Sequence, residues 1–147
     1  MIKAEGIHKT FEDFTALDNI TCNISDGCIY GMVGSNGAGK STFLRVLSGI
    51  YKPDKGCAYI DDEPIYENPK VKENIVFVSD ELFFLPGATM SKMADFYSSI
   101  YDRFNYDRFL KLAELFELNI KKPIFKGHET SGFYHTRTLN KGKIYVF

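Results

Sequence analysis

Nine consecutive residues carry the clearest chemistry in this sequence, a glycine-rich stretch that runs into a lysine and two hydroxyl residues. They are Gly34, Ser35, Asn36, Gly37, Ala38, Gly39, Lys40, Ser41 and Thr42. Their spacing fits the pattern G-x-x-x-x-G-K-[ST], in which backbone N–H groups surround phosphate oxygens. In such a loop Lys40 reaches the β- and γ-phosphates as a cation, and the Ser41 hydroxyl binds Mg²⁺. The stretch therefore predicts the binding of a nucleoside triphosphate together with Mg²⁺.

This phosphate-binding loop, residues 34–42, needs a strand before it and a helix after it. Residues 28–33 are a short apolar run that predicts a buried strand, and apolar residues recur at helical spacing over residues 41–48. A helix that begins at Lys40 points the positive end of its dipole at the same phosphates. This context favours a binding site over a glycine-rich turn that happens to contain a lysine.

The rest of the chain supplies further strands and then helices. Residues 2–7 and 16–24 alternate apolar with polar side chains and predict two strands, and residues 57–60 and 75–78 predict two more. From residue 90 to residue 118 the apolar period becomes helical, with two amphipathic stripes. The first stripe comprises Met93, Phe96, Tyr97, Ile100 and Phe104, and the second comprises Phe109, Leu112, Ala113, Leu115 and Phe116.

Length and charge restrict the class of protein. The chain has 147 residues, of which 44% are hydrophobic and 25% charged, a balance typical of one soluble globular domain. Its net charge of -1 excludes binding to nucleic acid or to an anionic membrane by bulk charge. No apolar run approaches the roughly 18 residues that span a bilayer, and residues 1–5 do not begin a secretory signal. We therefore expect no nucleic-acid partner, no transmembrane segment of its own, and three reduced cysteines.

The order of the segments resembles the ATP-binding subunit of ABC transporters. The residues that carry the resemblance are 7–11, 16–20, 27–42, 47–49 and 53–56, and the similarity extends over roughly residues 1–126. Within the family the order is most similar to bacterial exporters with separate ATPase and membrane subunits. The resemblance implies an α/β fold of the P-loop NTPase class, in its N-terminal portion. Residues 1–88 would form a nucleotide-binding core of antiparallel strands with a β-P-loop-α unit, and residues 89–124 part of a helical subdomain.

The resemblance also implies ligands and partners. ATP and Mg²⁺ are the expected cofactors. Phe11 lies where the family has an aromatic residue that stacks on adenine, with an ordinary core residue beside Phe14 as the alternative, and Ala16 lies near the nucleotide as well. The expected partners are a membrane permease and a second ATPase subunit, which places the chain in the cytoplasm on the inner face of the membrane.

Asp80 and Glu81 admit two interpretations. The resemblance places Asp80 where the family has a glutamine that contacts Mg²⁺ and the attacking water, and a carboxylate there is a candidate metal ligand. Residues 75–81 also form an apolar run that ends in Asp-Glu. Taken by itself, this run resembles a Walker B motif. In that second interpretation the protein is a P-loop NTPase or interaction module outside transport, and Asp80 and Glu81 act on Mg²⁺ and water.

The resemblance ends in residues 125–147, where the signature motif and the Walker B strand would be expected. A shift of reading frame explains this tail, because codons for Gly-Met-Lys-Arg encode His-Glu-Thr, as in residues 128–130, when they are read one base out of register. A naturally divergent short protein is the alternative. The resemblance therefore implies an ATP-binding subunit that couples ATP binding and hydrolysis to export through a separate membrane permease, in a truncated chain to which no catalytic residue is assigned. The alternative is an ATP-binding remnant without hydrolysis or transport.

Overall fold

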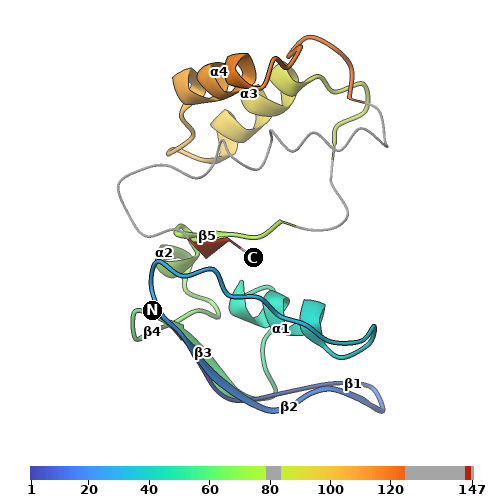
Figure 1. The fold of residues 1–147 in the computed structure, drawn as a ribbon, viewed down its shortest axis with the longest axis vertical. Coiled ribbons are helices and arrows are strands. Elements are labelled where there is room, and N and C mark those ends of the chain that lie inside the picture. The colour runs from blue at the N-terminus through green and yellow to red at the C-terminus, as the bar shows by residue number, and fades with distance from the viewer. Residues whose placement is uncertain (79–83, 125–144, 147) are drawn as a thin grey trace. The chain divides into compact units, whose positions relative to one another are not determined.

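The computed structural model describes residues 1–78, 84–124 and 145–146, and these divide into two compact units (Figure 1). The first unit comprises Met1–Phe77 with the C-terminal residues 145–146, and the second begins at Val78. The division therefore follows Phe77, earlier in the chain than residue 88, where the sequence suggested that the core ends. Most of the predicted tail, residues 125–144 and 147, lies outside the described residues, so the frame-shift hypothesis stays a prediction.

An antiparallel sheet forms the base of the first unit. Its strands are β1 (Ile2–Phe11), β2 (Phe14–Ile24), β3 (Lys55–Ile60) and β4 (Glu63–Pro64), in the order β2-β1-β3-β4. β1 and β2 form a hairpin in which Ile2 pairs with Ile24 and Phe11 pairs with Phe14. The strands predicted at residues 2–7, 16–24 and 57–60 are confirmed, because alternation places one face of each strand in the core.

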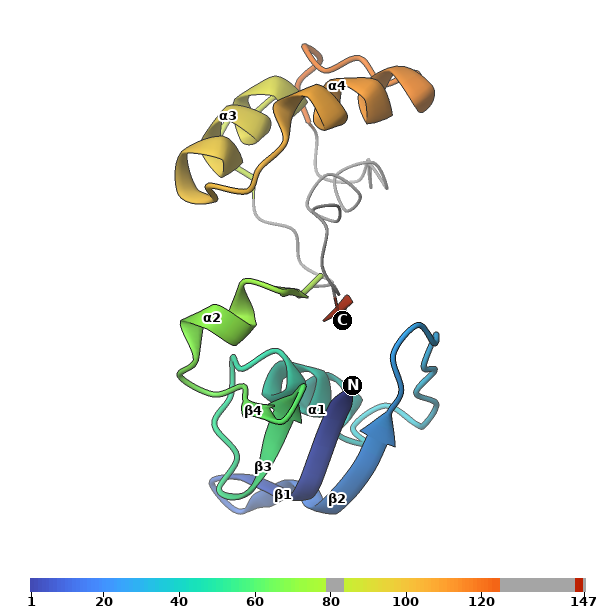
Figure 2. The same ribbon diagram turned by 90° about the vertical axis from the view of Figure 1, so that its left-hand side faces the viewer.

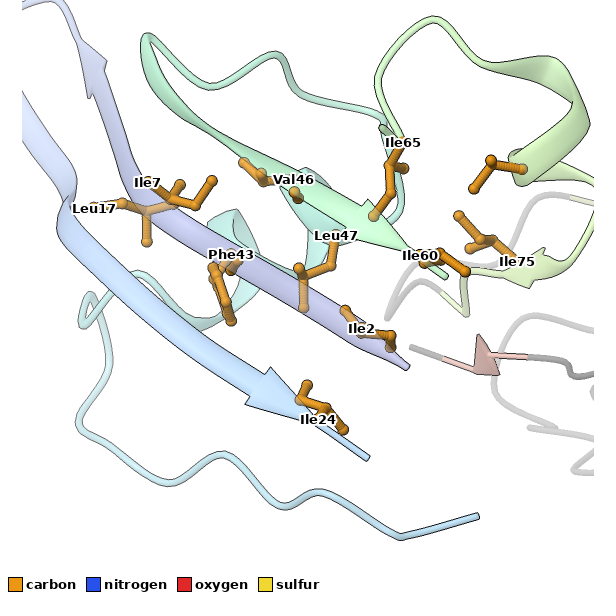
Figure 3. Packing of buried hydrophobic residues seen from close by; sticks show 13 residues of the cluster. Ile2, Ile7, Leu17, Ile24, Phe43, Val46, Leu47, Ile60, Ile65 and Ile75 are labelled. Carbon is orange, nitrogen blue, oxygen red and sulfur yellow. The ribbon is translucent and has the colours of Figure 1, made fainter. Parts of the chain in front are cut away.

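One short helix covers this sheet. α1 (Lys40–Leu47) directs Phe43, Val46 and Leu47 at the buried side chains of β1, β2 and β3, as Figure 3 shows. These three side chains are almost fully buried, and burial of side chains of this size contributes roughly 1.5–3 kcal/mol each. The helix predicted from Lys40 is therefore confirmed, and its packing fixes the phosphate-binding loop against the sheet.

The remainder of the first unit is a short helix and a pair of parallel strands. α2 (Pro69–Lys72) has Asn68 as its N-cap, whose side chain accepts a hydrogen bond of 3.3 Å from the backbone N–H of Val71. β5 (Ile75–Val76) pairs in parallel with β6 (Tyr145–Val146). The strand predicted at residues 75–78 is thus present but shorter.

The strand predicted at residues 28–33 is wrong. The backbone there is irregular, and the side chains of Ile29 and Val33 are 103% and 98% exposed. An apolar run of this kind is typical of a central strand with neighbours on both sides, because such strands are buried on both faces. Within the described part of the chain no strand lies beside it, so the run has no ladder to join.

We predict that Cys28, at the start of this run, is the fastest thiol to react in the native protein. Its side chain is exposed, whereas Cys22 and Cys57 are partly buried, and burial raises the pKa of the Cys22 thiol. Less of the Cys22 thiol is then in the reactive thiolate form, so we expect Cys28 to react with DTNB roughly tenfold faster. Peptide mapping after maleimide labelling would identify the residue. Three equally slow thiols would indicate that residues 28–33 are buried.

The second unit is a pair of helices, which Figure 2 shows from the side. α3 (Met90–Ile100) and α4 (Tyr106–Leu115) have N-caps Thr89 and Asn105, whose side chains accept from backbone N–H groups at 3.2 and 2.8 Å. Their shared core contains Met90, Ala94 and Phe109. Neither helix in the described residues, nor any other there, has the length and apolar character that a membrane crossing requires.

Both predicted helical stripes are buried only in part. Met93 and Phe109 are fully buried, as expected, but Ile100 is 53% exposed and Leu115 is 72% exposed. α3 ends at Ile100 and α4 at Leu115, whereas Phe104 and Leu118, which follow the two helix ends, pack against the shared core. An apolar period shows which residues of a helix can be buried, and the packing of the surrounding segments decides which of them are.

Candidate functional site: the phosphate-binding loop

The phosphate-binding loop ends in the first turn of α1. Gly39 is the N-cap and has a left-handed backbone with φ 83°, and Gly37 has φ 82°. The first turn contains no acidic residue, and Gly39 offers no side-chain acceptor to the N–H groups of that turn. The helix N-terminus therefore presents backbone donors and a positive dipole to an anion.

Gly39 also fixes the loop against the β1–β2 hairpin. A Cβ atom added at Gly39 would lie 2.2 Å from the carbonyl oxygen of Ala16 and 3.0 Å from Cδ2 of Leu17. Only a residue without a side chain permits this approach. The structure thus brings Ala16 next to the loop, while its contact with a nucleotide stays a prediction.

Lys40 lies over the loop that precedes it. Its Nζ donates hydrogen bonds of 2.7 Å to the carbonyl oxygens of both Gly34 and Ser35. The backbone N–H of Ala38 donates to the same Ser35 carbonyl at 3.3 Å, which closes the turn. The ammonium group therefore lies within the curve of the loop. A phosphate bound there would accept a hydrogen bond from its third N–H group.

The hydroxyl residues that follow Lys40 begin the helix. Ser41 is exposed and Thr42 is half-buried. An exposed hydroxyl beside a lysine and a helix N-terminus fits the oxygen ligands that Mg²⁺ prefers, with phosphate and water oxygens as the other ligands. In the described residues no group of three or more His, Cys, Asp or Glu side chains is placed to bind a metal ion. Asp80, the second predicted metal ligand, and Glu81 lie outside those residues.

Phe11 ends β1 at the tip of the hairpin. The alternative that it is a core residue beside Phe14 is wrong, since Phe11 is 39% exposed and Phe14 is more exposed still. Ala16, which touches the loop, follows Thr15, and Thr15 pairs with Thr10. The aromatic ring and the phosphate-binding loop are therefore attached to the same end of the hairpin.

Two residues to which the sequence assigned no role contact the Phe11 ring, and a third, Asp54, fixes one of them. The ring of Tyr51 lies 5.4 Å from the Phe11 ring at 66°, and Lys9 Nζ lies over the Phe11 ring at 5.5 Å from its centroid. Asp54 accepts a hydrogen bond of 2.8 Å from Lys9 Nζ and one of 2.7 Å from the backbone N–H of Thr10. Tyr51 and Asp54 lie at least forty positions from the residues that they contact here, so no local spacing in the sequence indicates these contacts.

The Asp54 carboxylate stays ionised at neutral pH. Hydrogen bonds from Lys9, and from the backbone of Thr10, lower the pKa of Asp54 below its ordinary value of 3.8. A carboxyl whose pKa is lowered on folding contributes its stabilisation above the unfolded pKa and loses it as pH falls through the folded value. The contact between Lys9 and Asp54 is therefore complete above about pH 4 and is lost only in stronger acid.

Known proteins share this arrangement. Residues 17–137 match the family described as ABC transporter. The arabinose import ATP-binding protein AraG 1 of Burkholderia ambifaria is 33% identical over 94 residues, which is 62% of this chain and 19% of that protein. A dimeric ATP-binding cassette solved in a post-hydrolysis state with ADP and Pi is 25% identical with a TM-score of 0.69, and the likeness covers 93% of this chain and 66% of the cassette.

A further solved structure has the same fold. The protein cbiO1 of Clostridium perfringens, part of the ABC transporter complex cbiONQ, is 27% identical with a TM-score of 0.62, over 83% of this chain and 53% of that one. The chain thus spans about a fifth of the curated relative and roughly half to two thirds of these solved cassettes. These likenesses confirm the predicted α/β fold of a P-loop ATP-binding domain.

Proposed function

The chain belongs to the ABC transporter family, and on that premise we propose that it binds ATP with Mg²⁺ through the phosphate-binding loop. The observation that carries the proposal is the position of Lys40, which lies over the curve of the loop at the N-terminus of α1. Backbone N–H groups, a lysine ammonium and the positive end of a helix dipole converge there, and a polyphosphate satisfies all three.

Each predicted residue then has a distinct task. The loop N–H groups contact the phosphates, and Lys40 neutralises charge on the β- and γ-phosphates. Ser41 contributes one oxygen ligand to Mg²⁺, which when bound balances the charge of the triphosphate. Asp80 is a second candidate ligand. Phe11 offers a partly exposed ring on which adenine stacks.

We further propose that the chain is the ATP-binding subunit of a transporter. A membrane permease and a second ATPase subunit are its proposed partners, at the cytoplasmic face of the membrane. The direction of transport that the sequence suggested was export. The curated relative is named for import, and the match to the ABC transporter family does not specify a direction of transport. Export therefore stays a prediction.

Hydrolysis is proposed to be slow in this chain. A water-activating residue is needed for efficient turnover, and we assign none, apart from the candidates Asp80 and Glu81. Binding without efficient turnover matches the remnant that the sequence suggested. If Asp80→Ala or Glu81→Ala abolished a measurable turnover, the compact Walker B interpretation would replace this proposal.

Titration calorimetry with ATP, ADP and AMP, each with Mg²⁺, tests nucleotide binding. We expect ATP and ADP to bind and AMP to bind at least roughly tenfold more weakly, because the loop contacts phosphates beyond the first. Removal of Mg²⁺ with EDTA should weaken ATP binding. It should leave the melting temperature of the free protein unchanged. Equal affinity for AMP and ATP, or no binding of either, would contradict the proposal.

A further inference from the structure

We propose that Tyr51 is a positioning residue for nucleotide binding, because it holds the Phe11 ring in the orientation in which adenine stacks on it. This inference rests on the proposed function. It adds that Tyr51, by orienting Phe11, increases the preference of the site for a nucleotide over a bare polyphosphate. Tyr51 itself need not touch the ligand.

The contact between the two rings is direct. Their centroids are 5.4 Å apart and their planes are inclined at 66°, an edge-type arrangement that aromatic pairs prefer. Phe11 stands near the tip of an exposed hairpin, where Glu12 has φ 50°. A ring at such a tip would otherwise rotate among several orientations. Contact with Tyr51 removes part of that freedom while leaving 39% of the Phe11 side chain exposed.

Tyr51 is itself attached to the helix that begins at the phosphate-binding loop. Its backbone N–H donates to the carbonyl oxygen of Arg45 at 3.0 Å, and the Arg45 guanidinium lies over its ring at 5.8 Å. Arg45 is in the last turn of α1, and Lys40 is in the first. One short helix therefore connects the residue that would bind phosphate to the residue that orients the base-stacking ring.

Lys9 and Asp54 restrict Phe11 from a second direction. Lys9 Nζ lies over the ring and is fixed by the Asp54 carboxylate, which also accepts from the backbone N–H of Thr10, the residue before Phe11. The Phe11 ring is thus contacted by the Tyr51 ring and by the Lys9 ammonium. Tyr51 is held by its hydrogen bond to Arg45, and Lys9 by its hydrogen bond to Asp54. This is the arrangement expected of a preorganised binding side chain, because ordering the ring before binding reduces the entropy lost on binding.

The test compares affinities for ATP and for inorganic tripolyphosphate, each with Mg²⁺, in the full chain. We expect Tyr51→Leu to weaken ATP binding roughly three- to tenfold, the range that follows from immobilising one side chain, while tripolyphosphate affinity stays within about twofold. Tyr51→Phe should retain the preference for ATP, since the ring remains. Phe11→Ala measures how much of the preference for ATP over tripolyphosphate remains when the ring is absent.

Tyr66→Leu is the matched control. Tyr66 belongs to the same unit and has Lys52 and Lys72 over its ring, both at 5.7 Å, so its loss removes a comparable aromatic contact away from Phe11. Equal weakening of ATP and tripolyphosphate by Tyr51→Leu would mean a merely structural role and overturn the inference, as would an unchanged preference for ATP. If the parent chain binds neither ligand, the proposed function fails and the inference with it. If it binds tripolyphosphate but Phe11→Ala leaves the preference for ATP unchanged, the inference and the proposed stacking of adenine on Phe11 both fail, while phosphate binding by the loop stands.

Discussion

Lys40→Ala is expected to reduce the affinity for ATP–Mg²⁺ by roughly 100- to 1,000-fold. The lysine would make hydrogen bonds to ionised phosphate oxygens, each worth about 1.5–3 kcal/mol, and every 1.4 kcal/mol is about a factor of ten. In the free protein the same Nζ makes two exposed hydrogen bonds to loop carbonyls. Bonds of that kind contribute roughly 1 kcal/mol each at most when water can replace them, so the fold should persist.

Calorimetry with ATP–Mg²⁺ and a thermal melt of the same sample measure the two effects of Lys40→Ala separately. Lys111→Ala is a suitable control, because it removes an exposed lysine from α4 in the other unit. An affinity that stays within about threefold of the parent would mean that the loop does not bind phosphate through this lysine.

Gly39→Ala is expected to destabilise the first unit by about 2–6 kcal/mol and to abolish nucleotide binding. A non-glycine residue with φ near 83° costs roughly 1–3 kcal/mol. The added methyl group would also lie 2.2 Å from the Ala16 carbonyl oxygen, which belongs to the backbone and cannot rotate away. Separating the loop from the hairpin relieves that clash, at a cost of the size seen when a well-packed region is overfilled, roughly 1–3 kcal/mol.

Urea denaturation of Gly39→Ala, compared with Gly34→Ala, isolates this effect. A Cβ atom at Gly34 would meet the Ala38 side chain at 3.4 Å and Cδ of Lys40 at 3.8 Å, both ordinary contacts, and Gly34 has no positive φ. Gly34→Ala should therefore denature close to the parent midpoint. Similar midpoints for Gly39→Ala and the parent would show that the loop is not packed on Ala16 in solution.

The loop could be predicted from the sequence because its chemistry depends on adjacent residues. The glycines, Lys40 and Ser41 act within one turn, so their order along the chain already defines the motif. The start of α1 at Lys40 and the alternation of β1 and β2 followed from periodicity in the same way. In each case the forces that form the element act over a few residues.

The failures have a common physical cause in contacts between distant segments. Residues 28–33 have the composition of a central strand, but a strand also needs neighbours, and composition does not reveal whether they are present. Tyr51 and Asp54 meet the end of β1 only because β3 returns antiparallel to it. Leu115 is apolar at the right period and still exposed, while Leu118 beyond the end of α4 packs against the shared core of the two helices, so periodicity alone does not decide which residue is covered.

The exposed run that includes Ile29 and Val33 has a consequence for how the protein behaves as its concentration changes. An exposed apolar segment that pairs with no strand among the described residues can pair with a strand of another molecule, and two molecules can supply that strand to each other. Pairing between molecules is second order, so it gains weight as the protein becomes more concentrated. We therefore expect dilution to favour the monomer and a rising concentration to favour self-association through this run.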